Sequence, residues 1–233
     1  MRVAIMQPYF LPYLGYWQLL HAVDKFVIYD NIEFSKRGWF HRNQILMNNE
    51  AKLFSLPIKK DSDFLDVRER YIADDGLKQL RKIVGQIKSA YSKAPHFKEV
   101  IPIIEQLFLY DEKNLFKYIL NAIKSIKKEI KIDTEIIVSS EVEIDHSLKG
   151  ENKVLAICKQ LNASSYLNAI GGLELYDRNR FAEEDIPISF IKMDEIIYDQ
   201  KSSSFVPYLS IIDVLMHNNK EEISKMLDKY SML

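Results

Sequence analysis

The first 30 residues combine two patterns of apolar positions, which together predict a strand, a helix and a second strand. Residues 2–6 (RVAIM) form a short β-type run, and residues 24–30 (DKFVIYD) form another. Between them, after a loop with two prolines, apolar residues of the segment 13–23 recur at helical spacing. We therefore expect a βαβ unit and a parallel sheet. The loops after both strands then meet at the carboxyl edge, where open α/β sheets bind ligands.

The next part of the chain changes from strand patterns to helix patterns. An Asn48-Asn49 turn between two apolar runs predicts a β-hairpin over 39–58. The polar segment 61–75 predicts an exposed, mobile loop. Apolar residues at i, i+3 and i+4 then predict three consecutive helices over 76–131.

After this helical block the α/β alternation resumes as far as the strand IPISFIKM, and two amphipathic helices follow over 207–230. Pro207 suits the first turn of the first of these helices. The prediction is an α/β fold with an open, mostly parallel sheet and a Rossmann-like first βαβ unit. A β-hairpin and an inserted three-helix block (76–131) complete a single domain over 1–233.

Composition narrows the function classes. The chain has 233 residues, 32 Lys+Arg, 33 Asp+Glu and a net charge of −1, so we expect no nucleic-acid partner. One cysteine and five dispersed histidines predict no disulfide and no structural metal site. No apolar run is long enough for a membrane span and no signal peptide is recognisable, so we expect a cytoplasmic protein. The 7 glycines leave little for a glycine-rich phosphate loop, whereas the 13 tyrosines are in excess.

The loop after the first strand is the first candidate site. A strand followed by a proline-containing loop and a helix resembles nucleotidylyltransferases, whose H-x-G-H motif would here be Tyr13-Leu14-Gly15-Tyr16. Tyrosine can bind phosphate oxygens but lacks an imidazolium charge, and Gly15 would allow the helix to approach the sheet closely. The alternative is that these aromatic side chains only pack the first helix. The candidates in this loop are Gln7, Pro8, Tyr9, Pro12, Tyr13, Gly15 and Tyr16.

A basic and aromatic segment follows the second strand. Asp30 ends that strand, and cations interleaved with Phe34, Trp39 and Phe40 come next. Arginine forks and lysine charges bind phosphate, so this segment predicts a site for a phosphorylated or nucleotide-linked ligand. A surface charge run is the alternative. The candidates here are Asp30, Lys36, Arg37, His41, Arg42 and Asn43.

Three further places carry candidates. Ser139-Ser140 end a strand, and Lys149 and Lys153 flank the start of the next helix, where an anion would account for them. Gly171-Gly172 follow another strand and allow either close approach to a ligand or a simple turn. Asp213 lies on an otherwise apolar helix, either exposed or buried with an arginine of the basic segment as its partner.

Four segments together resemble the WbqC-like protein family over nearly the whole chain. They are VAIMQPYFLPYLGYWQLL, DKFVIYDNIEFSKRGWFHRNQI, YLNAIGGLELYD and FVPYLSIIDVLMHN. The resemblance implies a place among bacterial proteins of surface polysaccharide (O-antigen) synthesis and sugar modification. It implies no defined reaction and no catalytic residues.

The residues and the resemblance together predict a transferase acting on a nucleotide-activated or phosphorylated sugar, with acyl or aminoacyl transfer as one form of the reaction. Asp30, Tyr9 and Gln7 are the expected catalytic residues, and the other candidates bind the substrate. The expected ligand is a nucleotide or nucleotide sugar, with or without Mg²⁺. Two alternatives remain: a divergent nucleotidylyltransferase with tyrosines in place of histidines, and a non-catalytic scaffold of a glycan-assembly complex.

Overall fold

A computed structural model describes residues 1–233. The strands are β1 (Arg2–Met6), β2 (Lys25–Ile28), β3 (Arg42–Met47), β4 (Glu50–Ser55), β5 (Glu135–Val138), β6 (Ser165–Ala169), β7 (Ile188–Met193) and β8 (Tyr230–Met232). The α-helices are α1 (Leu14–His21), α2 (Gly76–Tyr91), α3 (Phe97–Phe108), α4 (Leu115–Glu129), α5 (Gly150–Gln160), α6 (Arg178–Glu183), α7 (Ile211–His217) and α8 (Lys220–Leu227). No helix is both long and apolar enough to cross a membrane.

Six strands form an open sheet in the order β5-β2-β1-β6-β7-β8. Every neighbouring pair is parallel except β7 and β8, which are antiparallel. The predicted open, mostly parallel α/β sheet is therefore confirmed. The edge strand β8 was not predicted, because three residues carry too short a pattern to be recognised.

The strand order contains a reversal beside β1. This strand pairs with β2 on one side and with β6 on the other. The connections after β1 and after β5 therefore lead in opposite directions across the sheet. A crevice outside the carboxyl ends of the strands at such a reversal is where ligands bind in open α/β sheets.

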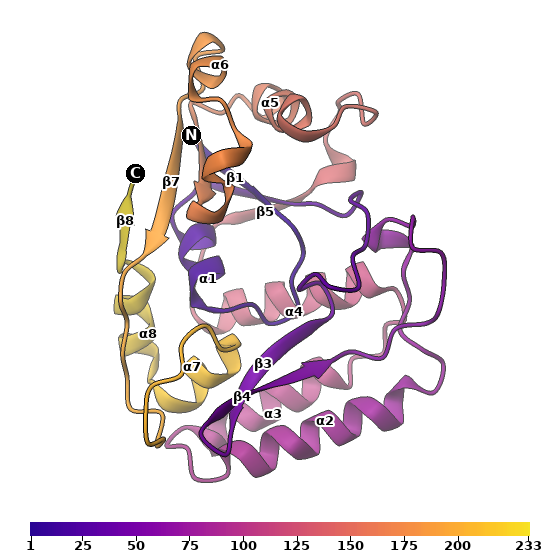
Figure 1. Cartoon of the computed structure of the whole chain (residues 1–233), viewed down its shortest axis with the longest axis vertical. Coiled ribbons are helices and arrows are strands. Elements are labelled where there is room, and N and C mark those ends of the chain that lie inside the picture. Colours follow the sequence, from indigo (N-terminus) through magenta and orange to yellow (C-terminus); the bar gives the residue numbers. More distant parts are fainter.

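Alternate residues of the strands face two different hydrophobic clusters. Ala4, Phe26 and Ile28 belong to the larger cluster, which also contains buried residues of α1, of α2 to α4 and of α7 and α8. Val3 and Val27 face the smaller cluster, beneath α5 and α6. Helices thus cover both faces of the sheet (Figure 1), as a parallel sheet with two apolar faces requires.

The hairpin and the helical block occupy the lower half of Figure 1, away from α5 and α6. β3 and β4 pair antiparallel around Asn48 and Asn49, whose φ angles are 55° and 65°. A tight turn of this kind needs left-handed residues, and asparagine accepts that conformation. The hairpin and the three helices α2, α3 and α4 are confirmed where the sequence predicts them.

The start of the C-terminal helical region differs from the prediction. Helix α7 begins at Ile211, and the Ser210 hydroxyl caps it by accepting a hydrogen bond from the Ile212 amide at 3.3 Å. Pro207 therefore lies in the preceding loop, and its placement in the first helical turn is wrong. Tyr208 separates Pro207 from helix α7, because its backbone is left-handed (φ 58°) and cannot be part of a right-handed helix.

Candidate functional site

Asp30 lies directly beyond β2, at the carboxyl edge of the sheet, and it is 4% exposed. Its Oδ1 accepts hydrogen bonds from the Ser139 hydroxyl and the Ser140 amide, both at 2.9 Å. Its Oδ2 accepts from the Ser140 hydroxyl at 2.6 Å and lies 4.0 Å from a guanidinium nitrogen of Arg68. Both oxygens of the Asp30 carboxylate therefore accept hydrogen bonds from residues that follow β5. This arrangement is typical of a group that holds neighbouring residues in position.

Asn31 continues this network outward from Asp30. The Ser139 hydroxyl also lies 2.6 Å from Asn31 Oδ1, so Asn31 Nδ2 is free to donate to His146 Nδ1 at 3.1 Å. This contact leaves the ring proton of a neutral His146 on Nε2. The residues Asp30, Asn31, Arg68, Ser139, Ser140, His146 and Lys153 are called the β2–β5 cluster below.

Lys153 supplies the least exposed cation of this cluster. The residue is 8% exposed, and its ammonium lies 5.4 Å from the centre of the Tyr29 ring. Its one hydrogen bond is a long contact of 3.4 Å to the Asn31 carbonyl. Burial lowers the pKa of Lys153, while Asp66 and Asp30 act in the opposite direction. A cation with so little hydrogen bonding of its own can still donate to an anionic ligand.

The segment 61–75, predicted as an exposed and mobile loop, contacts the β2–β5 cluster through Arg68. The Arg68 amide donates to the Asp30 carbonyl at 3.2 Å. Arg70 is 2% exposed, donates to the Ser62 carbonyl at 2.6 Å, and stacks 4.8 Å from the Phe34 ring centre. Most residues of the segment are exposed, as predicted, but the buried Val67, Arg70 and Ile72 and the backbone hydrogen bonds anchor it to the rest of the domain.

Sequence reasoning missed Arg68 and Asn31 as members of the candidate site. Arg68 lies in a polar segment that carries no periodic pattern, and nothing in its spacing indicates the contact with Asp30. A usable signal for Asn31 was available, since it directly follows Asp30 at the predicted carboxyl edge.

The basic candidates after Asp30 do not gather around one ligand space. Lys36 is exposed and pairs with Asp63 at 2.6 Å. The Arg42 guanidinium donates to the backbone carbonyls of Arg37 and Gly38 and lies 5.5 Å from the Trp39 ring centre. These contacts hold the loop after β2 in shape.

The two other candidates of this segment are turned inward. Asn43 is 4% exposed and donates to the carbonyls of Phe10 and Leu11, at 3.1 and 2.7 Å. The His41 ring packs at an angle of 51° against the Phe34 ring, with ring centres 5.2 Å apart. Burial, with the neighbouring Arg42 second, lowers the pKa of His41 to about 4.

The tyrosines of the first loop point in different directions. The Tyr16 hydroxyl is buried and donates to the Gln7 carbonyl at 3.2 Å, and burial raises its pKa well above the usual range. The Tyr9 hydroxyl donates to Gln7 Oε1 at 3.0 Å. Tyr13 instead lines a separate pocket near β7. The tetrad Tyr13-Leu14-Gly15-Tyr16 therefore does not present two donors to one ligand.

Gly15, Pro8 and Pro12 shape this loop. A Cβ on Gly15 would lie 2.5 Å from the Tyr13 ring. The glycine therefore makes room for that ring, whereas the sequence predicted that it makes room for the sheet. Pro8 is buried, and the Pro12 carbonyl accepts a hydrogen bond from the Trp17 indole at 3.0 Å.

The remaining candidates lie apart from one another. Lys149 is exposed at the start of α5. Gly171 is open to solvent, whereas a Cβ on Gly172 would meet the amide nitrogen of Asn168 at 2.5 Å. Gly172 therefore permits a close contact with the end of β6.

Asp213 is fully buried, but the predicted arginine partner is wrong. Its Oδ1 accepts from the Tyr91 hydroxyl at 2.9 Å. Its Oδ2 accepts from the Tyr198 hydroxyl at 2.7 Å and from Gln200 Nε2 at 2.8 Å. These three neutral donors come from α2 and from the segment before α7, and His217 Nδ1 on the same helix lies 3.6 Å from Oδ1. The carboxylate is therefore satisfied without an arginine of the basic segment.

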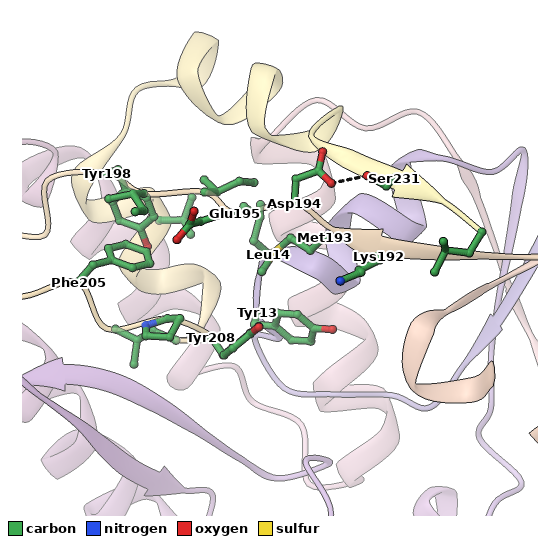
Figure 2. Close-up of a pocket in the computed structure, with 16 residues that line it drawn as sticks. Tyr13, Leu14, Lys192, Met193, Asp194, Glu195, Tyr198, Phe205, Tyr208 and Ser231 are labelled. Atoms are coloured by element: carbon green, nitrogen blue, oxygen red, sulfur yellow. Dashed lines mark hydrogen bonds between the residues drawn. The ribbon is translucent and has the colours of Figure 1, made fainter. Parts of the chain in front are cut away.

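A pocket lies on the other side of β1 from the β2–β5 cluster, next to the end of β7 (Figure 2). Its volume is about 820 Å³, and Tyr13 contributes to it from the first loop. Tyr198 and Phe205 lie at one end of it and Lys192 at the other. No group of three or more His, Cys, Asp or Glu side chains is arranged to hold a metal ion.

Comparison with known proteins gives one family and one relative. The model of the WbqC-like protein family matches residues 7–225. The chain is 29% identical over 227 residues to Rv1507c of Mycobacterium tuberculosis, an uncharacterized protein, covering 94% of this chain and 95% of that protein. No solved structure gives a significant match.

Proposed function

This chain belongs to the WbqC-like protein family, and we propose that it is a transferase that binds a phosphorylated or nucleotide-linked sugar at the β2–β5 cluster. The cluster lies at the carboxyl edge of a parallel sheet with helices on both faces, which is the usual place for nucleotide-type ligands. The proposal agrees with the surface-polysaccharide context that the family resemblance implies.

The observation that carries the proposal is the Lys153 ammonium. It is nearly buried, its pKa is lowered by that burial, and its one hydrogen bond is 3.4 Å long. Removing a cation from water is costly unless a partner compensates it. A phosphate oxygen would supply that partner, and the half-exposed Arg68 guanidinium next to Asp30 would supply a second cation.

The other members of the cluster position the substrate in this proposal. Asp30 already accepts three hydrogen bonds from the two serines, so we assign it the task of holding the end of β5 and Arg68 rather than removing a proton. His146, whose Nδ1 faces Asn31, offers its Nε2 proton to a substrate oxygen. Gln7 and Tyr9, at the end of the neighbouring strand β1, orient the sugar.

Nucleotidyl transfer is less well supported by the geometry. That reaction would need the residues at the two histidine positions to face one phosphate chain. Tyr16 donates into the protein interior, whereas Tyr13 lines the pocket near β7.

A binding measurement with matched lysine variants tests the proposal. We expect UDP-hexoses, measured by calorimetry at fixed ionic strength, to bind the unaltered protein. Lys153→Met should weaken this binding by about tenfold to a hundredfold, the value of a hydrogen bond from a charged donor. Lys149→Met, an exposed lysine four residues earlier, should leave it unchanged within about twofold.

Three outcomes would each contradict part of the proposal. If no nucleotide sugar or sugar phosphate binds, the ligand class is wrong. If both lysine variants bind like the unaltered protein, the site is wrong. If binding depends on Lys153 but the Lys153→Met protein still supports glycan modification in cells, the scaffold alternative replaces the transferase.

A further inference from the structure

The pocket beyond β7 has an apolar floor and a polar rim. Leu14, Ile196, Leu209 and Val214 line it and are between 3% and 8% exposed. No buried polar atom without a partner belongs to this lining. The floor therefore offers contact area but no hydrogen bonds.

All the charged side chains of the pocket belong to exposed residues. Lys192 carries one positive charge, and Asp194 and Glu195 carry two negative charges. Asp194 already accepts a hydrogen bond from the Ser231 hydroxyl at 2.6 Å, as Figure 2 shows. The rim thus has a net charge of −1, from one cation and two anions, which does not favour a phosphate group.

The aromatic side chains do not form a flat slot. Tyr13 and Tyr208 meet at an interplanar angle of 72°, and Tyr198 and Phe205 meet at 82°. A nucleobase binds best against the face of a ring that is free to stack. Edge-to-face rings over an aliphatic floor instead form an irregular apolar wall that an alkyl chain can follow.

Two rim residues keep apolar surface exposed. Tyr208 has a φ of 58°, a strained conformation for a bulky residue, and is 68% exposed. Ile197 is 66% exposed. A strained, uncovered aromatic side chain beside a pocket of ligand size is a feature of binding sites.

We propose that this pocket binds the alkyl or acyl chain of a second substrate of the transferase. The statement that the bound alkyl group belongs to a substrate rests on the proposed function. The statement that the pocket binds an alkyl group does not. β2 and β7 are three strand spacings apart, roughly 14 Å. The phosphate-binding cluster and the apolar pocket would therefore hold two ligands on opposite sides of β1, with Gln7 and Tyr9 between them.

The test uses neutral esters, so that it is independent of the phosphate site. We expect methyl butanoate, methyl hexanoate and methyl octanoate to bind, measured by ligand-observed NMR titration. Affinity should rise about fourfold for each added methylene, the value of burying one methylene group in an apolar site. Lys153→Met should leave this series unchanged.

Variants of the exposed rim separate binding from folding. Tyr208→Gly should weaken methyl octanoate binding by about tenfold without loss of stability, because glycine suits the left-handed backbone. Ile197→Asp should weaken it at least as much. Asp185→Gly replaces another left-handed residue, with φ of 56°, outside the pocket and should bind like the unaltered protein.

The proposal is overturned if affinity does not depend on chain length, or if the two rim variants bind like the Asp185→Gly control. It is also overturned if nucleosides compete at the pocket more strongly than the esters do. If esters do not bind at the pocket but sugar binding depends on Lys153, only the pocket proposal fails. If sugar binding does not depend on Lys153 but ester binding depends on Tyr208, only the proposed phosphate site fails.

Discussion

The two tyrosines that donate to Asp213 should differ in their contribution to stability, although the same atom is deleted from each. Tyr91 and Tyr198 both direct a hydroxyl at this buried carboxylate, at 2.9 and 2.7 Å. Only the Tyr91 hydroxyl has a second task, since it accepts a hydrogen bond from the Leu46 amide of β3 at 2.9 Å. We predict that Tyr91→Phe is the more destabilising substitution.

The expected difference follows from what each variant leaves unpaired. Tyr198→Phe removes one hydrogen bond to Asp213 Oδ2, but Gln200 still donates to that oxygen. The expected loss of stability is about 1.5–2 kcal/mol. Tyr91→Phe removes a similar bond and also leaves a buried amide without an acceptor, which adds about 1–3 kcal/mol. The total for Tyr91→Phe is therefore roughly 2.5–5 kcal/mol.

Urea unfolding of the two variants and of the unaltered protein measures this difference. The three curves should share one slope, so that their midpoints report the free energy of unfolding. In an Asp213→Asn background, Tyr91→Phe should still cost more than Tyr198→Phe, because the Leu46 amide loses its acceptor in either background. Equal costs for the two variants, or a larger cost for Tyr198→Phe, would refute the assignment of a double role to Tyr91.

Two further predictions concern the glycine pair and His41. Gly172→Ala should lower the free energy of unfolding by about 1–3 kcal/mol, because the new methyl group meets Asn168, whereas Gly171→Ala should change it by less than about 0.5 kcal/mol; similar losses in thermal or urea unfolding would contradict this. The pKa of folded His41, about 4, lies below the ordinary value of 6.5, so the unfolded chain binds more protons in between, and the stability of the protein should fall as the pH drops from about 6.5 to about 4. His41→Phe should flatten this part of the curve of unfolding free energy against pH, and an unaltered slope would exclude His41 as its cause.

The sequence predicts the parts of this fold that depend on local periodicity. The first βαβ unit, the Asn48-Asn49 hairpin and the helices α2 to α4 each bury one regular face, and that face is visible in the spacing of apolar residues. The spacing of apolar residues does not reveal the three-residue strand β8, which depends on its pairing with β7. It does not reveal the late start of α7 at Ile211 either, which depends on the left-handed Tyr208.

The candidate site was only partly predictable for a related reason. Asp30 and Ser139 follow strands with clear patterns, and Lys153 lies in the first turn of a helix with a clear pattern, so their place at the carboxyl edge could be derived. Arg68 reaches Asp30 from an irregular segment, and only tertiary contacts determine which way such a segment folds. The partners of Asp213 could not be derived either, because they come from positions more than 100 residues away as well as from nearby ones.

The hydrogen bonds between Asp30 and its two serines join positions 109 and 110 residues apart in the chain. Contacts of such high order form late, because the entropy of closing a long loop must be met before they form. During synthesis at roughly 5–20 residues per second, Ser139 leaves the ribosome roughly 5–22 s after Asp30. A nascent chain that ends before Ser139 can already hold its hairpin and its three helices, but it lacks part of the proposed phosphate site, so the proposed activity can arise only after Ser139 and Lys153 have been synthesised.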